Sequence, residues 1–308
     1  MLSVYDLSIS FSHYSFGLKK REVRAIEDLY LQVSAGQIMA VIGQSGAGKS
    51  LLAHALLGIL PRHALLTGSL FFKGRPLTEQ RLAELRGREI ALIPQSITSL
   101  NPLLRVGAQV ARAARLSGVS KKKVGLAVHQ AFARYGLKDD VAKLFPHQLS
   151  GGMARRVLTA TATIGKADLI VADEPVNGLD VPTAKETLAH LRELADSGKG
   201  VLLITHDIEA ALQVADKVTV FWAGTTLEVA AADNFREGGR LRHPYTRALW
   251  NALPTNAFLL ARQQPALTPP GSPGCPFRLC CARQDSLCAE RAPKLRNAGQ
   301  GMVRCHHA

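Results

Sequence analysis

A short apolar strand, a glycine-rich turn and a helix constrain this chain more than any other feature. In the stretch IMAVIGQSGAGKSLLAHALLGILP, the spacing of glycines, lysine and serine matches G-x-x-x-x-G-K-[ST]. Glycines allow backbone N–H groups to curl around phosphates, and the dipole at the start of the next helix favours anions. We therefore expect a nucleotide site made by Gly43, Ser45, Gly46, Gly48, Lys49, Ser50 and Leu51.

Two acids follow a second apolar strand, DLIVADE at 168–174. An acidic turn that only closes a strand is the structural alternative, and the phosphate loop argues against it. Beside such a loop, Lys49 is expected to reach the β- and γ-phosphates, and the Ser50 hydroxyl to bind Mg²⁺. Asp173 suits outer-sphere binding of Mg²⁺, and Glu174 suits a base that polarises the attacking water.

Composition excludes several classes of protein. Hydrophobic residues make up 47% of the 308 positions, which is enough for a buried core. No apolar run approaches the roughly 18 residues of a membrane span, and the N-terminus lacks the basic start of a signal peptide. These features predict a cytosolic chain.

The net charge of +14 suggests an anionic partner, or simply a solvated basic surface. Residues 229–308 hold eleven Lys and Arg against four Asp and Glu. Because no aromatic-interleaved basic patch or RNA-binding motif accompanies this charge, no nucleic-acid partner is expected.

The segment LSGGMARR at 149–156 narrows the function further. It lies before the acidic strand and opens a helical stretch, and it resembles the signature segment of the ABC ATPase family. The resemblance implies a Q-loop at Gln95 in ALIPQ, which also contacts Mg²⁺, and a D-loop at Asp180 in NGLD. It also implies a switch histidine, His206 in LLITHD, which orients the water together with Glu174.

The resemblance further implies a head-to-tail dimer. Ser150, Gly151 and Gly152 lie at an expected helix N-terminus, which is a second anion site. In the family this site faces the γ-phosphate bound by the opposite subunit. Phe11 lies where the family places an aromatic ring against adenine, and a core phenylalanine is the alternative.

Three other stretches resemble the oligopeptide, dipeptide and nickel importer ATPases: SITSLNPLLRVGAQV, FPHQLSGGM and RHPYTRALWNALP. This branch implies a peripheral subunit on the cytoplasmic face of the plasma (inner) membrane. Its implied partners are a second paralogous ATPase, two transmembrane permeases and an extracytoplasmic substrate-binding protein. Ala154 and Cys280 depart from the branch pattern, which has basic residues there. The competing hypothesis is a non-transport ABC ATPase acting on ribosomes or nucleic acid with a redox-sensing cluster, but the single cassette argues against it.

All five cysteines lie at or after position 275. Disulfides are not expected in a reducing cytosol, whereas zinc, an iron–sulfur cluster and free thiols all remain possible. Resemblance to the importer branch implies a [4Fe–4S] cluster on Cys275, Cys281, Cys288 and Cys305, with zinc as the alternative.

The fold class expected is α/β, a P-loop NTPase with a small cysteine-rich extension. Residues 1–228 form the expected ABC ATPase domain, with a RecA-like core, an antiparallel β subdomain and a helical subdomain at about 96–159. Residues 229–308 form the expected importer-type extension, with a metal-binding tail at 263–308.

Overall fold

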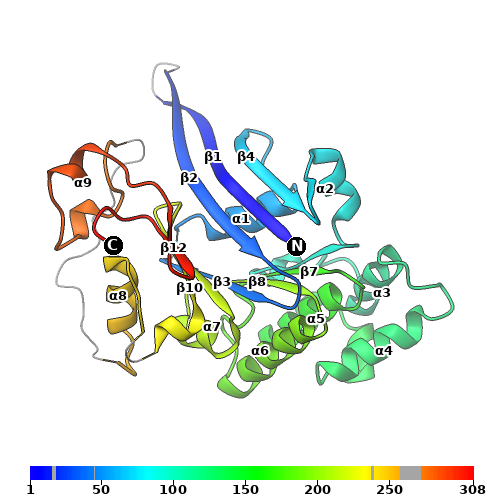
Figure 1. The fold of residues 1–308 in the computed structure, drawn as a ribbon. Helices are drawn as coiled ribbons and strands as arrows, with labels where there is room; N and C mark the ends of the chain where they lie inside the picture. The colour runs from blue at the N-terminus through cyan, green and yellow to red at the C-terminus, as the bar shows by residue number, and fades with distance from the viewer. Residues whose placement is uncertain (16–18, 45, 237–238, 257–271) are drawn as a thin grey trace.

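The computed structural model describes residues 1–15, 19–44, 46–236, 239–256 and 272–308, and Figure 1 shows their arrangement. Its centre is an eight-stranded sheet in the order β11-β12-β10-β9-β3-β8-β7-β6. From β9 to β6 in this order, every pair of neighbouring strands is parallel. The pair β9 and β10 is antiparallel. The bounds are β3 Ile38–Gly43, β6 Ile90–Ile93, β7 Leu169–Asp173, β8 Gly200–Thr205, β9 Lys217–Trp222, β10 Thr225–Ala231, β11 Arg296–Ala298 and β12 Gly301–Val303.

Both faces of this sheet are covered. Along β3, Ile38, Ala40 and Ile42 belong to the core on one face, whereas Met39 and Val41 belong to the core on the other. Such continuous apolar strands are typical of parallel sheets buried on both sides. One face packs against α5 Gly151–Thr163, α6 Val181–Asp196 and α7 Ile208–Val214, and the other lies toward α1 Lys49–Leu56 and a second sheet (Figure 1).

The second sheet is antiparallel, in the order β2-β1-β4-β5. A β-bulge in β1 changes which residues face the core. Val4 and Leu7 are three positions apart, so regular alternation would place them on opposite faces of the sheet, yet both are buried. Asp6 adopts a φ of 49° there, and Gly68 on β4 lies directly against it. The strands are β1 Leu2–Ser15, β2 Lys19–Val33, β4 Ala64–Phe72 and β5 Arg75–Pro76, followed by helix α2 Glu79–Leu85.

The predicted helical subdomain contains α3 Val106–Leu116 and α4 Val124–Arg134, and α5 continues beyond residue 159. Val106, Val110 and Ala114 form one buried stripe of α3, as helical spacing requires. Val106 and Val110 share a separate core with Phe132 of α4 and Val157 of α5. None of the helices in the described part of the chain combines the length and apolar character of a membrane span.

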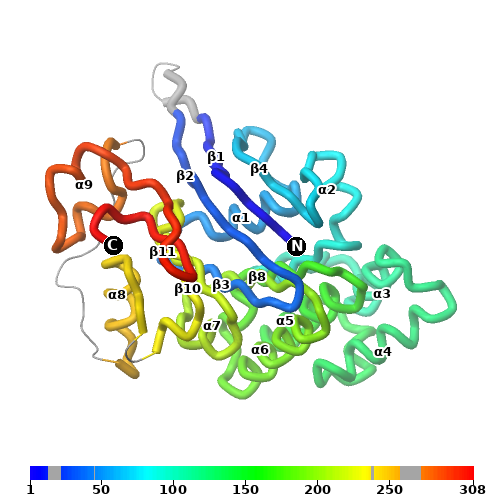
Figure 2. The backbone as a smooth tube through the Cα atoms, viewed as in Figure 1, coloured from blue at the N-terminus to red at the C-terminus, as the bar shows by residue number. Residues whose placement is uncertain are grey.

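The C-terminal extension joins the main sheet directly. It contains α8 Pro244–Asn251 and α9 Ser286–Glu290, followed by β11 and β12. Strand β12 pairs with β10, so Glu228 lies opposite Val303 and β10 runs across the predicted boundary at 228. Figure 2 shows this last segment returning beside α8. The domain boundaries stay a prediction, and the start of the predicted tail, residues 263–271, lies outside the described residues.

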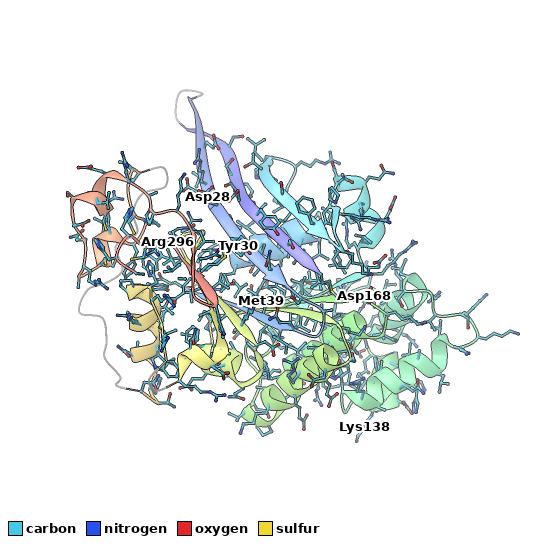
Figure 3. The ribbon with its side chains drawn as sticks, in the orientation of Figure 1. Asp28, Tyr30, Met39, Lys138, Asp168 and Arg296 are labelled. Carbon is cyan, nitrogen blue, oxygen red and sulfur yellow. The ribbon has the colours of Figure 1, made fainter. Side chains whose placement is uncertain are left out.

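Arg304 fastens the extension to both sheets. Its Nε donates to the Thr226 carbonyl of β10 at 2.9 Å, and one Nη donates to the Asp28 carbonyl of β2 at 2.8 Å. Figure 3 shows Asp28 and Tyr30 on this side of β2. Burial lowers the pKa of Arg304, and Asp28 opposes that shift.

We predict that Arg304→Ala destabilises the folded chain. It leaves two carbonyl groups without their charged donor, which costs about 2 kcal/mol and lowers the Tm by several degrees. Thermal unfolding followed by circular dichroism measures this change. Arg112→Ala, at an exposed position of α3, is the matched control and should leave the Tm unchanged. Equal Tm values for the two variants would contradict the role given to Arg304.

Candidate functional site

The phosphate loop connects β3 to α1 and is held by close backbone contacts. A Cβ atom on Gly43 would lie 2.4 Å from the carbonyl oxygen of Phe221 on the neighbouring strand. Gly48 has a φ of 89°, and its Cβ would lie 2.9 Å from the carbonyl oxygen of Ala25. Both positions therefore require glycine, the second for its conformation as well as for space. Ser45 lies outside the described residues.

Lys49 begins α1 and is buried at the mouth of this loop. Its Nζ donates to the carbonyl oxygens of Gly43 at 2.7 Å and Gln44 at 3.0 Å. Burial lowers the pKa of Lys49, and the carboxylates of Glu174 and Asp173 oppose this shift. The ammonium group is thus held by neutral carbonyls that a phosphate group could replace.

Asp173 ends β7 and has the character of a cation ligand. Its side chain is buried and lies near the Ser50 hydroxyl. Burial raises the pKa of Asp173, with repulsion from Glu174 adding to the shift. Its Oδ1 atom has no hydrogen-bond partner among the described residues. A buried carboxylate with an unused oxygen, beside a hydroxyl group, fits the oxygen ligands that Mg²⁺ prefers.

Glu174 is held from the neighbouring strand. Because β7 and β8 are parallel, their carboxyl ends meet at one edge of the sheet. Thr205 donates to Glu174 Oε2 at 3.2 Å, and His206 Nδ1 lies 2.8 Å from Oε1. The Glu174 backbone has a φ of 49°, and its N–H donates to the Ile204 carbonyl at 2.8 Å. The carboxylate is buried, while the His206 ring is half exposed.

A cavity of about 300 Å³ brings most of these groups together. Gln95, which follows β6, and Glu174, which follows β7, both line it. The geometry matches the arrangement expected for a nucleotide and its magnesium ion, although the individual roles stay predictions. The lining residues are Gly46, Gly48, Lys49, Ser50, Leu51, Gln95 and Glu174.

The signature residues lie elsewhere. Ser150 caps the N-terminus of α5, and its Oγ accepts from the Met153 N–H at 3.2 Å. Asp180 caps α6 in the same way, accepting from the Thr183 N–H at 3.2 Å. Both residues are exposed, Gly151 is exposed as well, and none of them lines the cavity described above. They are therefore available to another molecule.

Phe11 is not among the residues that line the phosphate loop cavity. Its side chain is half buried, packs against the core, and has its ring centre 5.5 Å from that of His63. Stacking on adenine stays a prediction for this residue.

Arg155 was not expected from the sequence. Its Nη1 donates to the carbonyl oxygens of Gln95 and Glu174, at 3.3 Å each. Burial lowers its pKa, and Glu174 opposes the shift. The sequence shows only that an arginine lies within the signature segment. The direction of its side chain depends on how α5 packs. Ala154 beside it is buried in the helical core, where a charged side chain has no room.

The cysteines form no disulfide. Cys275, Cys288 and Cys305 are buried, and Cys281 is half buried. Burial raises the pKa of Cys275 to about 11, and the other three sulfur atoms contribute to this shift. Among the described residues, no three of these sulfur atoms lie within 4.8 Å of one another.

A second ligand set overlaps the cysteines. Asp285, Cys288 and His307 place one ligand atom each within 4.8 Å of one another, and among the described residues no other such group of three occurs. Cys288 Sγ lies 3.5 Å from His307 Nε2, which in turn lies 3.2 Å from Asp285 Oδ2. This set fits a small divalent ion such as zinc.

We predict that Lys49→Ala weakens nucleotide binding by at least tenfold, because the loop loses the only charge that it points at the phosphates. Titration with a fluorescent ATP analogue measures the Kd. Lys185→Ala, at an exposed position of α6, is the matched control. Unchanged affinity in Lys49→Ala would show that the cavity is not the nucleotide site.

Comparison with known proteins places the chain in a family. The family model described as "ABC transporter" matches residues 26–177. The oligopeptide transport ATP-binding protein OppD of Escherichia coli is 35% identical, over 99% of this chain and 92% of that protein. The dipeptide transport ATP-binding protein DppD of Bacillus subtilis is 34% identical, over 94% and 88%.

A solved structure agrees on the fold. The dimeric ATP-binding cassette MJ0796, bound to ADP and phosphate, superposes with a TM-score of 0.66 at 22% identity, covering 75% of this chain and 99% of that one. The predicted fold class, an α/β P-loop NTPase, is therefore confirmed. The chain belongs to the ABC transporter family, among the ATP-binding proteins of oligopeptide and dipeptide transport.

Proposed function

We propose that this chain is the ATP-hydrolysing subunit of an importer for dipeptides or oligopeptides. The observation that carries the proposal is the Glu174 carboxylate, which Thr205 and His206 hold at the edge of the Lys49 cavity. A buried, oriented carboxylate at this place suits a base that acts on a water molecule beside the γ-phosphate. The relatives that match along nearly the whole chain are named for peptide transport.

The chemistry follows from what each side chain can do. Lys49 exchanges the Gly43 and Gln44 carbonyls for the β- and γ-phosphates of ATP. Ser50, Asp173 and Gln95 would hold Mg²⁺, which neutralises phosphate charge when it is bound. Glu174 accepts a hydrogen bond from the attacking water and polarises it. His206 keeps that carboxylate in position.

The exposed N-terminus of α5 supports a partner subunit. Ser150 and the glycines after it are an anion site that is remote from the chain's own cavity. We infer that they complete the nucleotide site of a second, paralogous ATPase in a head-to-tail pair. The further partners proposed are two transmembrane permeases and an extracytoplasmic substrate-binding protein, with this chain on the cytoplasmic face of the plasma membrane.

Peptides are the proposed cargo because the relatives reported above are named for them. The nickel complex remains the less favoured member of the same substrate set, since its support is the branch resemblance alone.

For the tail we propose a [4Fe–4S] cluster on Cys275, Cys281, Cys288 and Cys305, with zinc as the alternative. The burial of Cys275, Cys288 and Cys305, with Cys281 half buried beside them in the same tail, supports the cluster. The Asp285, Cys288 and His307 set supports zinc. Cys288 belongs to both sets, so the two metal groups exclude each other.

Glu174→Gln tests the ATPase assignment. The amide keeps the size of the carboxylate but cannot polarise water, so ATP binding should persist while kcat falls by about 100-fold or more. Steady-state phosphate release by the assembled transporter measures this. Glu186→Gln, on the exposed face of α6, should hydrolyse ATP at the unaltered rate. Near-normal turnover by Glu174→Gln would reject Glu174 as the base.

Metal analysis of anaerobically purified protein distinguishes the two tail proposals. The cluster predicts about four iron atoms per chain and a brown colour that Cys275→Ser abolishes and His307→Ala preserves. Stoichiometric zinc, lost in His307→Ala and retained in Cys275→Ser, would replace the cluster with the Asp285, Cys288 and His307 site.

A further inference from the structure

Helix α5 belongs to two packed cores of the molecule. Near its start, Ala154, Val157 and Leu158 lie in the core of the helical subdomain. Near its end, Ala162 lies in the core on one face of the main sheet. The helix contacts α3 and α4 as well as β6 at the sheet edge, as Figure 1 shows. The position of the helical subdomain is therefore connected to the sheet through this helix.

Two adjacent arginines of α5 reach different parts of the molecule. Successive side chains of a helix are turned by about 100° around its axis. Arg156 Nη1 donates to the carbonyl oxygen of Tyr135 at 3.4 Å, which is a contact within the helical subdomain. Arg155 Nη1 instead donates to the carbonyl oxygens of Gln95 and Glu174, at 3.3 Å each. Arg155 thus connects the start of α5 to the edge of the sheet.

The two carbonyl groups that Arg155 bridges belong to segments of the nucleotide cavity. Gln95 follows β6 and Glu174 follows β7, and these strands are neighbours in the sheet. Both residues line the cavity at Lys49, whereas Arg155 is not among its lining residues. A charged donor shared by two carbonyl groups restrains the segments that carry them. We therefore expect Arg155 to influence the nucleotide chemistry through Gln95 and Glu174.

The backbone of Glu174 depends on such restraints. Its φ of 49° is a conformation that residues other than glycine hold only when the surroundings fix it. Its N–H donates to the Ile204 carbonyl of β8 at 2.8 Å, and the Asn177 N–H of the same turn donates to its carbonyl at 3.3 Å. Arg155 donates to that same carbonyl oxygen. The Glu174 backbone is thus held by the sheet, by its own turn and by α5.

We propose that Arg155 is a positioning residue that couples the seating of helix α5 to the orientation of Glu174 and Gln95. The proposal rests on the ATPase function proposed above. Because Ser150 caps the exposed start of the same helix, Arg155 would also link a partner's contact at Ser150 to this chain's own cavity. The proposal predicts slower hydrolysis with unchanged nucleotide affinity. An ordinary packing role predicts lower stability with an unchanged kcat.

Arg155→Met is the first test, because it removes the charged donor and keeps a long side chain. Steady-state phosphate release by the assembled transporter should show a kcat lower by about tenfold. The Kd of the full chain for a fluorescent ATP analogue should change by less than about twofold, since Lys49 is untouched. Arg155→Lys should retain most of the kcat, because a single nitrogen makes both contacts in the structure.

Arg304→Ala is the matched control. Arg304 also donates to two backbone carbonyl oxygens, those of Thr226 and Asp28, and it is not among the residues that line the cavity. This variant should have a lower Tm and an unaltered kcat when turnover is measured well below its Tm.

A double-mutant cycle with Glu174→Gln is the second test. If Arg155 acts through the Glu174 carboxylate, Arg155→Met should lower the residual kcat of Glu174→Gln by less than about twofold. An unchanged kcat in Arg155→Met, an equal loss in Arg304→Ala, a loss in Arg155→Lys as large as in Arg155→Met, or independent effects in the cycle would each overturn the proposal. Normal turnover by Glu174→Gln would show that the base is misassigned. If Glu174→Gln loses turnover and Arg155→Met does not, the ATPase site stands and the coupling through Arg155 is wrong.

Discussion

The rest of this structure depends on how tightly the phosphate loop is seated. Gly43 lies against the Phe221 backbone on one side, and Gly48 lies against the Ala25 backbone on the other. The loop is thus held between the parallel sheet and the antiparallel sheet, where neither contact tolerates a side chain. The loop therefore takes its shape only when both sheets are folded. The nucleotide site depends for this reason on the fold of the whole domain.

The seated loop determines where the other groups of the site must come from. Strand β8 lies next to β3, and β7 lies on the far side of β8, so the carboxyl ends of these two strands place Asp173, Glu174 and Thr205 on the side of the sheet where Lys49 lies. On its other side β3 adjoins β9, whose end carries Trp222 toward the tail. One edge of one sheet therefore serves both the chemistry and the attachment of the cysteine segment.

Local pattern was enough to predict where the candidate nucleotide-site residues lie in the fold, because they follow strand ends within short motifs. The phosphate loop, the acids of β7 and the cap residue Ser150 all lie where these patterns indicated. The β1 bulge, the direction of Arg155 and the attachment of Arg304 were not predictable, since each depends on contacts with residues far away in sequence. The metal proposed for the tail was only partly predictable. Four cysteines indicate a metal group, but the geometry also offers Asp285 and His307 as ligands.

The most direct test of the account is an experimental structure of the Glu174→Gln chain with ATP and Mg²⁺. In the structure described above, Lys49 Nζ donates to the carbonyl oxygens of Gly43 and Gln44. The account predicts that Lys49 leaves these carbonyls for the β- and γ-phosphates while the loop backbone stays in place. Mg²⁺ should lie near the unpaired oxygen of Asp173. Nucleotide bound elsewhere, with Lys49 still on its two carbonyls, would contradict the account.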